Sequence, residues 1–422
     1  MPLIVMKFGG TSMGSLERIG NVARRAVARR RAGDRIVIVV SAMAGETDRL
    51  LGMAGEIGHL PQDREVDVLL ATGEQVSIAL LALAIRKQGC EARSFLGHQV
   101  QIRTDSVHGS ARIHTIAAQP VHETLDKGEI VVIAGFQGVN EHGDITTLGR
   151  GGSDLSAVAM AAALKADACE IYSDVDGIYT TDPNLYAKAR RIERISCEEM
   201  LELASLGAKV LQTRSVEFAL KFKVPIHCRS SFHDGEGTWV LPGISSASSD
   251  SLAAEGDMVV QGLEGAVVTG VACDRNTAHV TVMDLPDRPG VAAALFRPLA
   301  GANVNVDVII QNPGRNGRTD LSFTVPRGDA DRVTALCEAL RGEVGFGSVF
   351  ADKDVAKVSV VGAGMRSQPG VALRAFDALG QAGVNILLIS TSEIKISCVV
   401  ADLHAQKAVQ VLHDAFELDK TP

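Results

Sequence analysis

The chain has 422 residues, 46% of them hydrophobic, and a formal net charge of −8 at pH 7. This length predicts roughly two to four domains with packed cores, and the acidic balance argues against nucleic acid as a partner. Seven cysteines form no CxxC pair, which argues against a metal cluster or a disulfide framework and indicates reduced thiols in a cytoplasmic protein. No signal-peptide pattern opens the sequence, and no apolar run approaches the ~20 residues of a membrane span, so we expect no membrane partner.

The N-terminal stretch predicts a strand, a glycine turn and a helix. Residues 3–6 are apolar and read as a buried strand, while residues 16–27 carry apolar side chains at helical spacing. Between them stands the run Lys7-Phe8-Gly9-Gly10-Thr11-Ser12. Glycines let the backbone approach a bound group, and the free N–H groups of a helix start favour an anion. The turn is therefore either a tight connection or a cradle for the phosphates of a nucleotide.

Two further predicted strands end in small or polar residues. Residues 36–40 form a buried strand that leads to Ser41 and Thr47, which are either helix caps or substrate contacts. Glu74 is predicted at a helix start, where a carboxylate is favourable in any case, so it is either a cap or a site residue. Residues 129–138 form another strand that ends in glycines.

The segment that points most directly to a ligand runs from Leu148 to Asp154. It places Arg150 between glycines at the mouth of a predicted alanine-rich helix, residues 155–164, which Ser153 or Asp154 can cap. A guanidinium is suited to bidentate contact with a carboxylate or phosphate. We therefore predict an anion site at this loop.

The next strand, which starts at residue 170, ends in acidic and aromatic residues. Tyr179 is suited to stacking on a base, and Asp174 or Asp182 to contacting a nucleotide or Mg²⁺, although an Asx-rich turn would also use these residues. Lys209, on a predicted helix, is either a second phosphate partner or a solvated side chain.

The C-terminal part contains an internal repeat. Residues 242–255 are rich in Ser, Gly and Ala and read as a linker after an α/β domain with a largely parallel sheet. After it, the tetrapeptide Pro-Gly-Val-Ala at 289–292 recurs at 369–372, each time after a strand and before a helix. These loops are predicted either to hold an amino-acid carboxylate or to serve as dimerisation modules without a ligand.

Taken together, these motifs and the tandem repeat resemble the aspartate kinase family across essentially the whole chain. The resemblance implies an amino-acid-kinase fold over residues 1–245, with an open, largely parallel sheet covered by helices on both faces. It also implies a linker at 246–260 and two ferredoxin-like ACT domains at 261–340 and 341–422. The implied reaction is phosphorylation of the side-chain carboxylate of L-aspartate by MgATP, the entry step to lysine, threonine, methionine and isoleucine.

The same resemblance implies the site residues. The catalytic candidates are Lys7, Arg150 and Asp174. The ATP-binding candidates are Lys7, Phe8, Gly9, Gly10, Ser173, Asp174, Tyr179, Asp182, Lys209 and Val210. The aspartate-binding candidates are Ser41, Thr47, Glu74, Arg150, Gly151, Gly152 and Ser153. Mg²⁺ is expected without direct protein ligands.

Lysine, threonine or both are expected to bind the repeats as feedback effectors, in a homo-oligomer or in a hetero-oligomer with a short regulatory subunit that starts near Met258. The candidates in the first repeat are Asp287, Arg288, Pro289, Gly290, Val291, Ala292, Asn305, Val306, Asp307 and Gln311. Those in the second repeat are Val371, Ala372, Asn385, Ile386, Ser392 and Glu393. We expect a monofunctional enzyme.

Two other functions remain open from the sequence. A kinase for glutamate or acetylglutamate would share the Arg150 loop, but the run Thr72-Gly73-Glu74 and the tandem repeat argue against it. A non-catalytic amino-acid sensor would share the fold, but the presence of Lys7, Glu74 and Arg150 argues against a decayed site.

Overall fold

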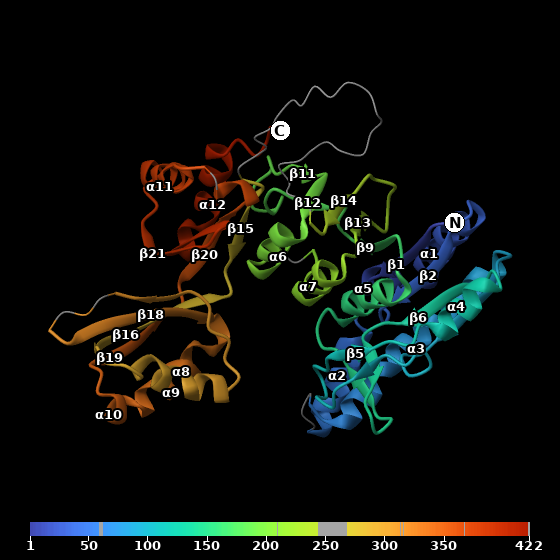
Figure 1. The fold of residues 1–422 in the computed structure, drawn as a ribbon, viewed down its shortest axis with the longest axis horizontal. Helices are drawn as coiled ribbons and strands as arrows, with labels where there is room; N and C mark the ends of the chain where they lie inside the picture. The colour runs from blue at the N-terminus through green and yellow to red at the C-terminus, as the bar shows by residue number, and fades with distance from the viewer. Residues whose placement is uncertain are drawn as a thin grey trace. The chain divides into compact units, whose positions relative to one another are not determined.

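The computed structural model describes residues 1–58, 62–208, 210–243, 268–312, 314, 316–366 and 368–420. These residues form two compact units (Figure 1). The N-terminal unit comprises residues 1–179, 191–204 and 210–243, and the C-terminal unit comprises 180–190, 205–208 and the described residues from 268 onward. The predicted linker at 246–260, Met258 and Lys209 lie outside the described residues.

An eight-stranded sheet forms the centre of the N-terminal unit. Its strand order is β12 (Arg194–Ser196), β14 (Thr238–Leu241), β13 (Ile226–Ser230), β9 (Ala168–Ser173), β1 (Leu3–Phe8), β2 (Arg35–Val40), β6 (Ile130–Ala134) and β3 (Ala92–Phe95). Every neighbouring pair is parallel except β13 and β14. The largely parallel sheet predicted from the alternation of strands and helices is thus confirmed.

Helices cover both faces of this sheet. On one face α1 (Leu16–Arg31) and α3 (Arg64–Lys87) pack against alternate side chains of β1 and β2. On the other, α5 (Gly152–Leu164) contacts β1, β2 and β9, and α7 (Thr213–Phe222) packs on α5. The remaining elements are η1 (Gly10–Met13), α2 (Glu46–Ile57), α4 (Gln119–Asp126), α6 (Cys197–Ser205), the pair β10 (Ile178–Tyr179) and β11 (Arg191–Ile192), and a small sheet of β5 (Ile113–Thr115), β4 (Arg103–Thr104), β7 (Gln137–Val139) and β8 (Ile145–Thr147).

Helix α3 corrects two expectations from the sequence. It begins at Arg64 after the Asp63 cap, so Glu74 lies inside the helix and not at its start. By length and composition alone α3 would also pass for a membrane span, although half of the apolar window is buried inside the structure. Its apolar residues Ile78, Leu81 and Ile85 belong to the core that it shares with α1 and β1. The apolar run therefore serves the packing of a core helix.

The C-terminal unit contains two four-stranded antiparallel sheets. The first has the order β17 (Ile309–Gln311), β18 (Arg318–Pro326), β16 (Thr277–Pro286), β19 (Ser348–Asp352), and the second the order β15 (Gly270–Asp274), β20 (Val355–Val361), β22 (Lys395–Ala401), β21 (Ile386–Thr391). The first sheet packs with α8 (Val291–Gly301), α9 (Ala330–Ala339) and α10 (Arg341–Val344), and the second with α11 (Val371–Gln381) and α12 (Ala405–Ala415). In each repeat the Pro-Gly loop stands between a strand and a helix, as predicted.

The two sheets do not follow the boundary predicted between residues 340 and 341. β19 lies after that boundary but pairs with β16 of the first repeat, while β15, which lies within the range predicted for the first domain, pairs with β20 of the second. The exposed edge of a sheet accepts any strand of suitable geometry within reach. Edge pairing of this kind depends on the tertiary fold and leaves no repeat signal in the sequence.

Candidate functional site

Four neighbouring parallel strands, β9, β1, β2 and β6, end at one edge of the large sheet. The segments that follow them are joined by backbone hydrogen bonds: Gly9 N–H to Tyr172 O (3.4 Å), Ser41 N–H to Phe8 O (3.1 Å) and Gly135 N–H to Val40 O (3.0 Å). In open α/β sheets this edge is where ligands bind. The structure therefore brings together the glycine turn, Ser41 and the glycines after β6.

The turn after β1 leads into a short 3₁₀ helix, η1, and only then into α1, whose start at Leu16 is capped by Ser15. The helix predicted from residue 16 onward is thus confirmed, whereas the 3₁₀ turn between the glycines and that helix was not predicted. The first amides of η1, at Gly10 and Thr11, have no intrahelical acceptor. A Cβ on Gly10 would lie 3.2 Å from Ala42 O, so the close approach of this turn to the loop after β2 favours glycine. The result is a tight backbone turn with free donors.

Lys7 forms an ion pair with Asp154 at this edge. The Lys7 Nζ lies 2.5 Å from Asp154 Oδ1, and the two side chains are only 11% and 12% exposed. The sequence predicts Ser153 or Asp154 as the cap of this helix, but the cap of α5 is Gly151, and Asp154 lies in the first turn. Its carboxylate compensates the charge of the nearly buried Lys7. This matters because a buried charge without a partner is strongly destabilising. The position of an acidic residue directly after the Arg150 loop is the feature of the sequence that could have indicated this ion pair.

Glu74 is 2% exposed and reaches the loop after β2. One oxygen, Oε1, accepts a hydrogen bond from Ala42 N–H at 3.1 Å, while Oε2 is buried without a partner among the described residues. Burial raises the pKa of Glu74 to about 8, against the opposing effect of the Ala42 bond. A Cβ on the preceding Gly73 would lie 2.8 Å from the Ala42 side chain, so glycine permits this close packing. The buried, unpaired oxygen is suited to a donor supplied by a ligand.

Arg150 lies between Gly149 and Gly151, whose φ values of 78° and 72° are in the left-handed region. Its side chain is exposed and has no hydrogen bond or ion pair within the described part of the chain. The loop lies close to the end of β6, because a Cβ on Gly135 would stand 2.9 Å from the Ser153 Cβ. Arg150 is thus displayed near the strand edge with its guanidinium available.

The remaining aspartate-binding candidates lie at the same edge. Ser41 follows β2, and Thr47 is the second residue of α2, which is capped by Gly45. Neither is a cap, contrary to one of the two readings of the sequence. Ser153 and Gly152 form the first turn of α5 and are buried.

The nucleotide candidates after β9 are engaged mainly in local turns. The Ser173 hydroxyl accepts from Val175 N–H at 3.3 Å, and the Tyr179 hydroxyl donates to Asp176 at 3.0 Å. Asp174 is exposed and Val210 is half-buried.

Asp182 lies in the segment 180–190 of the C-terminal unit. Its carboxylate accepts from Asn184 N–H at 2.8 Å. This bond is typical of an Asx turn, the alternative that the sequence offers to a nucleotide contact.

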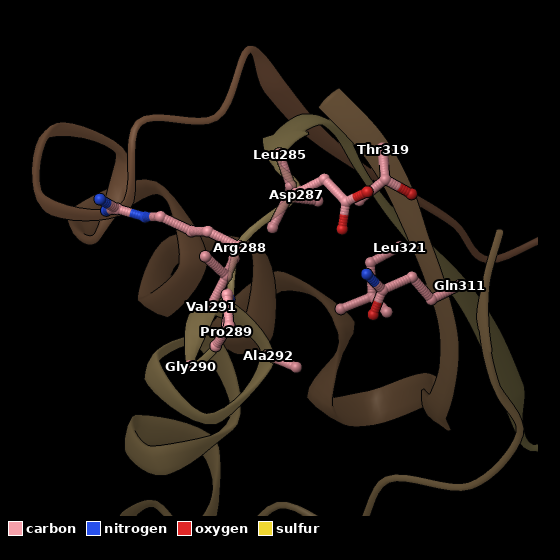
Figure 2. A pocket seen from close by; sticks show the side chains of 10 residues that line it. All are labelled: Leu285, Asp287, Arg288, Pro289, Gly290, Val291, Ala292, Gln311, Thr319 and Leu321. Carbon is pink, nitrogen blue, oxygen red and sulfur yellow. The ribbon is translucent and has the colours of Figure 1, made fainter. Parts of the chain in front are cut away.

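A cavity of about 370 Å³ lies in the first repeat, beside the Pro-Gly loop (Figure 2). Its lining residues are Leu285, Asp287, Arg288, Pro289, Gly290, Val291, Ala292, Gln311, Thr319 and Leu321. Seven of these were predicted. Leu285, Thr319 and Leu321 were missed, although the period of two along β18 places positions 319 and 321 on one face.

The cavity combines an acidic group with a helix N-terminus. Gly290, with φ at 91°, caps α8 without a side-chain bond, so the first amides of that helix lack intrahelical partners. Figure 2 shows the Asp287 carboxylate near Thr319, with the Gln311 amide facing the same space and the Arg288 side chain extending away. An amino acid's ammonium group requires a negative partner and its carboxylate a positive one. The Asp287 carboxylate and the N-terminus of α8 are partners of these two kinds.

Three first-repeat candidates, Asn305, Val306 and Asp307, do not line this cavity. Asp307 instead pairs with Lys357 of β20. Burial acts to raise the pKa of Asp307, but the bond and charge of Lys357 lower it overall.

None of the second-repeat candidates lines the cavity. Among them Val371 is buried, at the start of α11, whereas Asn385, Ser392 and Glu393 are exposed; Ala372 and Ile386 are half-buried.

Comparison with known proteins agrees with this architecture. Residues 2–230 match the amino acid kinase family, and residues 279–345 and 358–416 each match ACT domains. The chain is 50% identical over 419 residues to an aspartate kinase of Stutzerimonas stutzeri, covering 99% of this chain and 98% of that one. It is 48% identical to an aspartokinase of Corynebacterium glutamicum, covering 99% and 97%.

Solved structures give the same picture. The Escherichia coli aspartokinase III complex with aspartate and ADP superimposes with a TM-score of 0.79 at 26% identity, over 98% of this chain and 99% of that one. An aspartate kinase from Synechocystis is 44% identical with a TM-score of 0.53, over 100% of this chain and 70% of that one.

Proposed function

This chain belongs to the aspartate kinase family, and we propose that it transfers the γ-phosphoryl group of ATP to the side-chain carboxylate of L-aspartate, giving 4-phospho-L-aspartate. The observation that carries this proposal is the buried oxygen of Glu74, which has no partner among the described residues and lies beside the strand edge that holds Lys7. A buried acceptor without a donor is rare in folded proteins. The α-ammonium group of an amino acid would supply both the missing donor and a compensating charge.

Aspartate would then be held at both ends of its backbone. Glu74 would bind the α-ammonium, and the exposed Arg150 guanidinium would bind the α-carboxylate in a bidentate manner. Ser41, Thr47, Gly151, Gly152 and Ser153 would contact the remaining atoms. These contacts leave the side-chain carboxylate free to face the nucleotide.

The nucleotide would be held by the turn after β1. Lys7 and the amides at Gly10 and Thr11 suit the phosphates, Gly9 lets the backbone approach them closely, and Asp154 keeps the lysine at the strand edge. Phe8, Ser173, Asp174, Tyr179, Asp182, Lys209 and Val210 are the further nucleotide contacts proposed by family resemblance. Mg²⁺ would be carried by the phosphate oxygens, which suit this hard cation, and would neutralise phosphoryl charge.

The reaction needs little beyond alignment and charge compensation. A free aspartate side chain has a pKa of about 3.9, so the attacking carboxylate is already ionised near neutral pH and needs no general base. In phosphoryl transfer the protein acts mainly by positioning the reactants and stabilising the charge on the transferred group. Lys7 and the turn amides are the chain's own contribution to that stabilisation.

The cavity of the first repeat is proposed as an effector site. The structure of E. coli aspartokinase III with lysine and aspartate, at 26% identity and a TM-score of 0.75, shows that a relative binds lysine. In this chain the free amides of α8 suit an effector carboxylate, and Asp287 suits its ammonium. Lysine, threonine or both are the proposed effectors of a cytoplasmic oligomer.

The test is acyl-phosphate formation trapped with hydroxylamine. The full chain is incubated with MgATP and aspartate, glutamate or acetylglutamate, with and without lysine and threonine. Hydroxamate from aspartate only, suppressed by an effector, is the expected result. Product from glutamate or acetylglutamate would move the chain to a neighbouring activity, and effector binding without product from any substrate would leave a sensor.

A further inference from the structure

A second buried carboxylate, Asp67, lies on α3 and is fully buried. It accepts hydrogen bonds from the Thr147 N–H at 3.0 Å, from the Thr147 hydroxyl, and from the Gly109 N–H at 3.1 Å. His108 Nδ1 lies 2.8 Å from Oδ2; since a carboxylate only accepts, this nitrogen carries the proton. Asp67 thus has donors from two separate segments of the chain.

Both segments adjoin the Arg150 loop. Thr147 ends β8, three residues before Arg150, and its carbonyl accepts from Ala111 N–H at 2.8 Å. Gly109 approaches the loop directly, because a Cβ on Gly149 would lie 3.0 Å from Gly109 O. Asp67 therefore holds in place both β8, the strand that leads into the Arg150 loop, and the segment at Gly109 that contacts this loop.

Arg214 of α7 holds the same place from another element. Its guanidinium donates to Leu148 O at 2.8 Å and to Ala111 O at 3.0 Å. Residues 147 and 148 are thus tied by a carboxylate on one helix and a guanidinium on another. By contrast, the Arg150 side chain has no internal partner in the described residues. Its position depends on the backbone that these two charges hold.

We propose that Asp67, acting through Thr147 and assisted by Arg214, is a positioning residue that sets the location of Arg150 for the substrate's α-carboxylate. The inference rests on the role of Arg150 given under the proposed function. β8 has only three residues, so its ladder alone fixes its end weakly. A buried charge is also a costly way to secure a strand when apolar packing would serve.

The test compares variants of the full chain by steady-state kinetics with aspartate and MgATP varied in turn. Asp67→Asn keeps the shape but places an amide opposite N–H donors. It should raise the KM for aspartate roughly tenfold, the scale of losing a hydrogen bond to a charged group, with the KM for MgATP unchanged. Thr147→Val removes only the hydroxyl donor and should raise the KM for aspartate severalfold. Thr147→Ser keeps that hydroxyl and should leave the KM for aspartate near the wild-type value.

A matched control is available in the same strand. The Thr146 hydroxyl is buried and bonds the Thr104 hydroxyl at 2.6 Å, away from Asp67. Thr146→Val removes a bond of the same kind and should leave the KM for aspartate unchanged. If Asp67→Asn does not fold, the Thr147 and Thr146 variants decide the matter. Equal rises in both KM values, or an effect of Thr146→Val equal to that of Thr147→Val, would overturn the proposal.

A double-mutant cycle separates this inference from the function on which it rests. If Thr147 acts through Arg150, Thr147→Val should have no further effect on the KM for aspartate in an Arg150→Ala background. Additive effects would overturn the positioning role while leaving Arg150 as a substrate contact. An unchanged KM for aspartate in Arg150→Ala alone would overturn both.

Discussion

Helix α3 carries two buried carboxyl groups, Asp67 and Glu74, two turns apart. Asp67 is surrounded by four donors from the two segments beside the Arg150 loop. Glu74 has one donor, the Ala42 amide, and a buried oxygen with no partner in the described chain. The same helix therefore holds one carboxyl group whose bonding is complete and one whose bonding is not.

The difference separates two uses of a buried acid. A carboxylate with all its acceptor sites filled holds protein segments in place, and a ligand has nothing to add. Burial without enough donors raises the pKa of Glu74 to about 8, so the free group is mostly protonated near neutral pH, and a bound ammonium group would favour its ionised form. The Lys7–Asp154 pair is intermediate, because Asp154 balances the lysine's charge while Asp154 Oδ1 has no hydrogen bond of good geometry.

The largest expected effect comes from removing that lysine. Lys7→Ala should lower turnover by roughly 10³-fold or more, because the transferred phosphoryl group loses its nearest protein charge. Binding of lysine or threonine to the C-terminal unit, followed by calorimetry, should be intact. Unchanged hydroxamate formation would remove Lys7 from the mechanism.

Glu74→Gln tests the incomplete carboxyl group directly. The variant keeps the shape but loses the charge that would pair with the α-ammonium. The KM for aspartate should rise by about 10²-fold, since truncating one partner of a buried charge pair costs roughly 2–5 kcal/mol, with the KM for MgATP nearly unchanged. If the two KM values rise together, Glu74 does not bind aspartate.

The pH dependence of stability tests the raised pKa. The pKa of Glu74 is about 8 in the folded chain against an ordinary value of 4.5, so the folded state binds an extra proton between these values. The contribution of Glu74 to the free energy of unfolding is then fully present below about pH 4.5 and is lost as pH rises towards 8.

Relative to Glu74→Gln, the wild-type free energy of unfolding in urea should fall by about 1.4 kcal/mol between pH 6 and pH 7. A difference that does not change with pH would mean that Glu74 is already ionised in the folded chain.

The smallest expected effect concerns Asp287, another carboxylate with an incomplete set of donors. Among the described residues it accepts one hydrogen bond, from Gly314 N–H at 3.2 Å. Asp287→Asn should weaken the effector's binding by roughly tenfold and leave uninhibited turnover unchanged, as measured by inhibition curves. Arg288→Ala, whose side chain extends away from the cavity, is the control and should leave inhibition near wild type.

Much of the frame could be predicted from the sequence. Continuous apolar runs such as residues 36–40 mark buried parallel strands, and glycines at strand ends, such as Gly9 and Gly135, mark close backbone approach. The repeated Pro-Gly-Val-Ala loop located the two modules of the C-terminal unit because its spacing is a one-dimensional signal.

The charged partners were less accessible. The local pattern predicts Ser153 or Asp154 as a cap and Glu74 at a helix start, and it does not distinguish Asp67 from its neighbours. Each depends on a contact between residues far apart in the chain, such as Lys7 with Asp154 or Asp67 with Thr147. Short-range pattern contains no record of which distant donor a side chain will meet.

The sequence by itself determined where the strands lie, where the backbone turns on glycine, and that two modules repeat, because those features depend on local conformation and periodic burial. The tertiary structure alone decided which buried charges are satisfied and which are left open, and which edge strands β15 and β19 join. Hydrogen bonding and desolvation are settled only when distant segments meet. For that reason Asp67 and Glu74, which lie on the same helix, differ in their bonding and in the roles proposed for them.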